Sequence, residues 1–117
     1  MRRFSIISLL VCCCFLIAGI ATAAETPVTV KGEVVDTFCY ASMGARGESH
    51  AKCGMGCAKN GIPVGLVEGN KMYILLPAKD AQPLPAAVTE KMGKVVTVTG
   101  QAFSSGGVSF LTVESVK

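Results

Sequence analysis

The amino-acid sequence predicts a mainly β fold: a five-stranded OB-like barrel with a short capping helix and a Cys/His-bearing helical insertion after the first strand. Three observations support this prediction. Short segments that alternate apolar and polar residues recur along the chain, as in half-buried strands. One short helical pattern falls between the third and fourth of these segments, which is the element order of an OB barrel. A cysteine-rich stretch follows the first segment.

Five segments have the composition and alternation of strands, and turn residues separate them. Gly69-Asn70 is a tight-turn pair between the second and third segments, and Ser105-Gly106-Gly107 precedes the last one. The predicted strands are Val28–Val35, Val64–Glu68, Lys71–Leu76, Val95–Gln101 and Val108–Val116.

A short helix is predicted between the third and fourth strands. Pro85 suits its first turn, and Gly93 suits its end. Leu84, Val88 and Met92 fall on one side of this helix. We expect this apolar side to close one end of the barrel.

The insertion after the first strand has two predicted parts. Residues Ala41–Glu48 are small and polar, which indicates a flexible loop. Residues Ser49–Asn60 form a predicted helix, with Ser49 as the N-cap and Gly61 as the stop. Two glycines inside this helix each weaken it by about 1 kcal/mol relative to alanine; they are Gly54 and Gly56.

Residues 1–23 have the pattern of a cleaved signal peptide. Two arginines precede an apolar run at 4–20, and an Ala-Thr-Ala cleavage pattern occupies 21–23. We therefore expect a periplasmic or secreted protein in which residues 24–117 form a single OB-like domain. Membrane attachment is expected only through an uncleaved signal. Removing the two arginines lowers the net charge from +3 to +1, which leaves no basic field to attract nucleic acid.

Three thiols and the only imidazole of the chain lie in one short stretch, as Cys39, His50, Cys53 and Cys57. On a helix, His50, Cys53 and Cys57 stand at i, i+3 and i+7 and share one face. Thiolates and imidazole are ligands for soft and borderline metals, and four of them make a tetrahedral site. We therefore predict an exported metal-binding or metal-handling protein, with these four residues as ligands and Zn or Cu as the metal.

The same cysteines permit an alternative, a disulfide-stapled OB-like binding module for a protein or small ligand, without catalysis. A bond from Cys39 to Cys53 or Cys57 closes a loop of roughly 15–20 residues, worth about 3 kcal/mol. Disulfides persist in exported proteins. The mature chain has an odd number of cysteines, three, so one thiol is unpaired, is shared between chains or binds something other than sulfur. The sequence leaves both interpretations open.

Two neighbours of this stretch have alternative roles. Asp36 ends the first strand, or it accepts the ring N–H of His50 and so fixes the tautomer. Met43, in the predicted loop, is a packing residue or a further thioether ligand for Cu(I).

Other chemistry finds little support in the sequence. There is no Cys-x-x-Cys-His, so a haem site is not expected. Paired carboxylates and an oxyanion-hole segment are not recognised either, and no catalytic residue is assigned. The expected partners are a metal ion or another exported protein, with no nucleic acid.

On the stretches that contain these motifs, the chain resembles a family of small exported bacterial proteins. The resemblance implies an OB-like barrel with an Asp-x-x-Cys and His-x-x-Cys-x-x-x-Cys insertion, and it implies no established activity. It covers most of the mature domain, and the cysteine–histidine spacing is its most specific part. The resembling residues are 32–39, 50–61, 63–67, 71–73 and 93–100.

Overall fold

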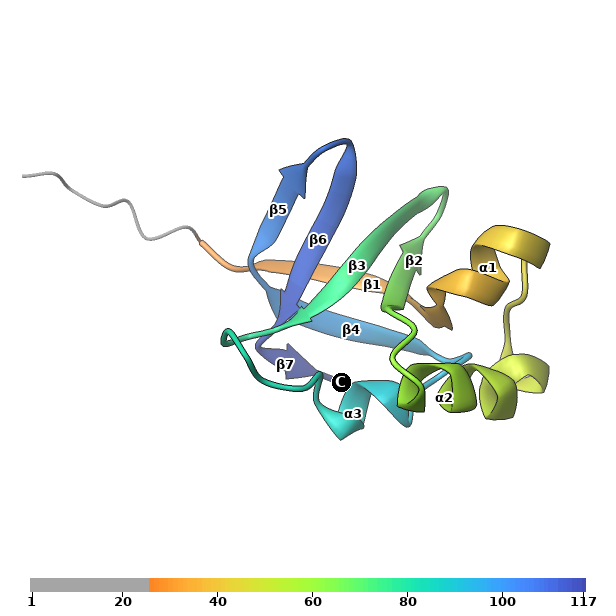
Figure 1. The fold of residues 1–117 in the computed structure, drawn as a ribbon. Helices are drawn as coiled ribbons and strands as arrows, with labels where there is room; N and C mark the ends of the chain where they lie inside the picture. Colours follow the sequence, from red (N-terminus) through yellow and green to blue (C-terminus); the bar gives the residue numbers. More distant parts are fainter. Residues whose placement is uncertain (1–25) are drawn as a thin grey trace, which may run out of the picture.

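The computed structural model describes residues 26–117, and the predicted signal peptide at 1–23 lies outside the described residues. The described chain is mainly β, as predicted, with one mixed seven-stranded sheet and short helices beside it (Figure 1). The strands are β1 (Val28–Asp36), β2 (Val64–Glu68), β3 (Lys71–Pro77), β4 (Val95–Gly100), β5 (Ala102–Ser105), β6 (Val108–Val113) and β7 (Ser115–Val116). The helices are α1 (Thr37–Met43), the 3-10 helix η1 (Glu48–His50), α2 (Ala51–Lys59) and α3 (Ala86–Thr89).

The strands are hydrogen-bonded in the order β5-β6-β3-β2-β1-β4-β7. Strands β1, β2 and β3 form an antiparallel meander in which Val34 faces Leu66 and Leu66 faces Tyr73. Strand β4 pairs antiparallel with the other edge of β1, and β6 runs parallel to β3. All five predicted strand segments are therefore strands in this sheet.

The number of strands differs from the prediction: seven form instead of five, and the hydrogen-bonded order ends at β5 and β7, so a closed five-stranded barrel is not confirmed. The additional strand β5 follows β4 after one residue, Gln101. The backbone N–H of Gln101 donates to Thr112 Oγ1 at 2.8 Å, and its carbonyl accepts from the Thr112 N–H at 2.9 Å. These bonds hold the chain at a corner between the two strands.

The predicted last strand is also divided. The N–H of Glu114 donates to the carbonyl of Thr99 at 2.9 Å, and Ser115 and Val116 then pair with β4 instead of β3. The residues before Glu114 therefore pair with β3 and β5, and those after it pair with β4, because the chain crosses from one part of the sheet to another at Glu114.

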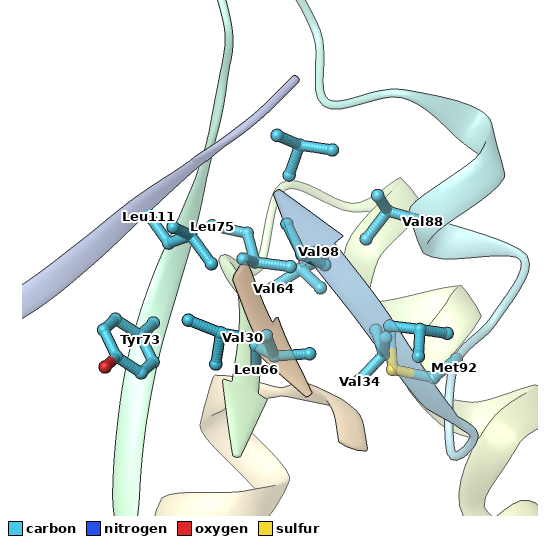
Figure 2. Close-up of a cluster of buried hydrophobic side chains, with 12 residues drawn as sticks. Val30, Val34, Val64, Leu66, Tyr73, Leu75, Val88, Met92, Val98 and Leu111 are labelled. Atoms are coloured by element: carbon cyan, nitrogen blue, oxygen red, sulfur yellow. The ribbon is translucent and has the colours of Figure 1, made fainter. Parts of the chain in front are cut away.

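The hydrophobic core collects alternate residues of the strands, as the period of two of a pleated strand requires. Val88 and Met92 cover this core from α3 and the turn after it, with 0% and 1% exposure (Figure 2). Leu84 packs against the same core, so the prediction that these three residues face one side is confirmed. The prediction that the helix continues to Gly93 is wrong, because α3 ends at Thr89 and a turn follows it. The core residues contributed by the strands are Val30, Val34, Val64, Leu66, Tyr73, Leu75, Val96, Val98, Leu111 and Val113.

Candidate metal centre

The site is built around Asp36, the last residue of β1, whose side chain is 0% exposed. Its Oδ1 accepts a hydrogen bond from the backbone N–H of Cys39 at 2.9 Å, and its Oδ2 lies 2.9 Å from His50 Nε2. A buried carboxylate is costly unless it is paired and hydrogen-bonded. Asp36 meets this condition by capping α1 and by orienting His50, so the predicted contact with the His50 ring is confirmed.

Helix α1 begins at Thr37, directly after its N-cap Asp36, and carries Cys39 in its first turn. An aspartate at this position is a favoured N-cap, because its side chain satisfies a backbone N–H that has no partner inside the helix. The helix ends at Gly44, which has a left-handed φ of 68° and donates its N–H to the Tyr40 carbonyl at 2.9 Å. The prediction of a loop over Ala41–Glu48 is therefore wrong for its first three residues, which belong to α1, and for Glu48, which begins η1. Met43 lies at the exposed end of α1.

Glu33 of β1 fixes the segment between α1 and η1. Its carboxylate lies 2.9 Å from Arg46 Nη2 and also accepts the backbone N–H of Gly47. The next turn begins at Gly47, whose carbonyl accepts the N–H of His50 at 3.1 Å. The helical segment thus starts with the 3-10 helix η1, and Ser49 lies inside η1. The prediction that Ser49 is the N-cap is wrong, because His50 holds that position for α2.

Helix α2 presents Cys53 and Cys57 one turn apart, with Cys53 exposed and Cys57 half-buried. The helix ends as predicted before Gly61, which has a φ of 88°. Gly54 lets α2 approach the sheet closely, because a Cβ at this position would lie 2.6 Å from Met92 Cγ and 3.3 Å from Asp36 Oδ2. This close packing covers Asp36.

The four predicted ligands come together around Cys39, but in two overlapping groups. The ligand atoms of Cys39, His50 and Cys53 all lie within 4.8 Å of one another. Those of Asp36, Cys39 and Cys57 form a second such group. The sequence did not indicate Asp36 as a candidate metal donor; it was interpreted as the end of a strand or as an acceptor for the His50 ring. The available signal was the Asp-x-x-Cys spacing, which places the carboxylate beside Cys39 once a helix starts there.

Burial raises the pKa of Cys39 to about 12, and the hydrogen-bonded carboxylate of Asp36 adds to this effect. Burial also raises the pKa of Cys57, with a contribution from the Asp36 charge. The pKa of Asp36 is lowered: burial acts to raise it, but the hydrogen bonds from the Cys39 backbone and from His50 outweigh burial. At neutral pH Asp36 is ionised and both thiols are protonated. A metal ion bound here would have to displace these protons, so its binding would depend on pH.

The three cysteines of residues 26–117 are free thiols, without a disulfide between them. Cys39 is the buried member and Cys53 is the exposed one.

Within the same described range, no helix combines the length and apolar character needed to cross a membrane.

Comparisons with protein-family models, with curated proteins and with solved structures found no match to this chain.

Proposed function

We propose that this protein is an exported metal-binding or metal-handling protein that binds Zn or Cu at the cluster of Cys39, His50, Cys53 and Cys57. The observation that carries the proposal is the convergence of the Cys39, His50 and Cys53 ligand atoms within 4.8 Å, although Cys39 comes from a different helix. Zinc bonds of about 2.0–2.3 Å to nitrogen and sulfur separate two ligands of one ion by about 3.5–4 Å. Small side-chain rotations therefore bring these donors to bonding distance.

The contact between His50 and Asp36 supports the same proposal. A metal-binding histidine usually offers its second ring nitrogen to a carboxylate, which fixes the tautomer and makes the ring a better ligand. Here Nε2 of His50 lies 2.9 Å from the buried Asp36 Oδ2. A metal bound without breaking this contact takes the other nitrogen, Nδ1.

The donor set favours two kinds of ion. Two thiolates, from Cys39 and Cys53, and a neutral His50 balance the charge of a divalent cation, which suits Zn²⁺. The high sulfur content suits Cu⁺, and affinity order favours copper where both metals are present. The partner is then the metal ion itself or an exported protein that exchanges it.

We also propose that the sheet is an OB-like barrel formed by residues 24–117, and that it is exported after residues 1–23 are removed. Counting β4 and β5 as one bent strand gives a circuit of five strands: β4 pairs with β1, and β5 pairs with β6. Helix α3 lies between β3 and β4 in the chain, where the OB order expects it. The mature domain then belongs with the exported family that it resembles, in the periplasm or outside the cell.

The test is thermal unfolding of the mature protein with and without Zn²⁺, chelator and reductant. At a metal concentration of a hundred times Kd, binding adds about 2.7 kcal/mol to stability. Cys39→Ser should lose this increment, because Cys39 belongs to both groups of donor atoms, and its melting temperature should be the same with Zn²⁺ as with chelator. Lys52→Ala is the matched control, because Lys52 is an exposed neighbour on α2 and should keep the full increment.

The disulfide-stapled module gives the opposite pattern. Reductant then lowers the melting temperature, and chelator has no effect. A protein of this kind has one free thiol per chain, whereas the protein with a metal site has three. That result would remove the metal proposal.

A further inference from the structure

We propose that the site offers one metal ion two alternative positions that share Cys39: an outer set of Cys39, His50 and Cys53, and an inner set of Asp36, Cys39 and Cys57. This inference rests on the proposed metal-binding function and adds a path for the ion. The two groups of donor atoms, each within 4.8 Å, define the two sets.

The two sets differ in access to solvent. The outer set contains Cys53, which is exposed, and His50, which is half-buried. The inner set contains Asp36, which is 0% exposed, and Cys57, which is half-buried. An ion from solvent therefore meets the outer set first, and an ion in the inner set is better protected from competing ligands.

The helix geometry brings the two positions close together. Cys53 and Cys57 are four residues apart on α2, which is a rise of about 6 Å along the helix axis. The Cys39 sulfur lies within 4.8 Å of both sulfurs. An ion that remains bound to Cys39 therefore has both Cys53 and Cys57 beside its shared ligand.

The exchange is a ligand substitution without a change of oxidation state. The bonds from the metal to Cys53 Sγ and to the His50 ring break, while bonds to Cys57 Sγ and to an Asp36 oxygen form. One proton passes from Cys57 to Cys53, so two thiolates hold the ion in either position. His50 and Asp36 are already in contact at 2.9 Å, and each belongs to a different set. The carboxylate and the imidazole thus stand beside each other at the point of exchange.

The experiment uses Co²⁺ as the probe, with reductant present and oxygen excluded. Wild-type protein should bind one ion per chain with the charge-transfer absorption of two thiolate ligands. A site with all four predicted ligands around one ion would show three thiolates. Three thiolates, or two ions bound together, would overturn the two-position inference while leaving metal binding intact. No Co²⁺ binding at all would instead refute the proposed function.

Two serine variants separate the positions kinetically. Cys53→Ser should slow both Co²⁺ uptake and release to a chelator, by the same factor of at least about tenfold, with Kd nearly unchanged, because both directions pass through the outer set. Cys57→Ser should leave uptake unchanged and speed release at least about tenfold, because the inner set is lost. Lys52→Ala is the control and should behave like wild type. Equal losses of affinity in the two serine variants would show a single position.

Discussion

Two glycines of α2 have opposite surroundings, and their substitution tests how the insertion packs on the sheet. A Cβ on Gly54 would lie 2.6 Å from Met92 Cγ, 3.0 Å from Met92 Sδ and 3.3 Å from Asp36 Oδ2. A Cβ on Gly56 meets nothing within 4 Å. Neither glycine has a positive φ, so alanine fits the backbone at both positions. The two substitutions therefore differ in packing alone.

The expected magnitudes follow from that difference. Alanine in place of glycine inside a helix gains about 0.5–1 kcal/mol, and Gly56→Ala should show this gain. In Gly54→Ala the same gain is offset by overpacking, which costs about 1–3 kcal/mol in a close-packed interior. Met92 is 1% exposed and is enclosed by the core, so its side chain has little room to move aside. We expect Gly54→Ala to be the less stable variant by the overpacking cost.

The assay is thermal unfolding of both variants in chelator, followed by circular dichroism. A difference of 1 kcal/mol shifts the melting temperature by about 4–8 °C in a domain of this size. A double-mutant cycle with Met92→Ala identifies the contact, because removal of Met92 Cγ and Sδ should make Gly54→Ala less costly. Equal stability of the two alanine variants, or a cycle without coupling, would refute the close packing of α2 against Met92.

Three further perturbations test other contacts. Glu33→Gln should lower the free energy of unfolding by about 1 kcal/mol and increase amide hydrogen exchange in the segment 44–47. Exchange as slow as in wild type would contradict this expectation. Metal-free protein should lose stability as the pH rises from about 9 toward 12, because the raised pKa of Cys39 favours folding while the thiol is neutral. Cys39→Ala should reduce this alkaline loss of stability when melting is measured against pH. The same pH profile in wild type and Cys39→Ala would show that Cys39 does not cause the loss. Gly100→Ala should cost about 3 kcal/mol or more in denaturant unfolding, because its Cβ would overlap the Thr112 carbonyl; a stable variant would argue against the β4–β5 corner.

The strands were predictable because each has a local pattern. Val28–Val35 alternates apolar and polar residues and became β1 with one residue added. Strand β5 has no such pattern, since all four of its residues are exposed and it forms only by pairing with β6. The division of the last strand at Glu114 depends on a partner, β4, that is distant in sequence. Local periodicity cannot show either feature.

The grouping of the candidate ligands was predictable from the sequence, but the burial of the group was not. The helical spacing correctly put His50 and Cys53 on a face directed at Cys39. The burial of Asp36 depends on how closely α2 approaches β1, which no local pattern reveals. The helical character of residues 41–43 was missed for a related reason, because the small polar composition indicated a loop while the cap at Asp36 set the start of a helix.

Gly54 links the stability of the fold to the chemistry of the site. The absence of a side chain at this position lets α2 lie against Met92 and brings its backbone close to Asp36. Asp36 is thereby removed from solvent, so its hydrogen bonds to Cys39 and His50 act in a medium of low dielectric constant, where they are stronger. The same helix carries Cys53 and Cys57. An ion bound between α1 and α2 would therefore hold together the two elements whose packing buries Asp36, and its binding energy would add directly to the stability of this small domain.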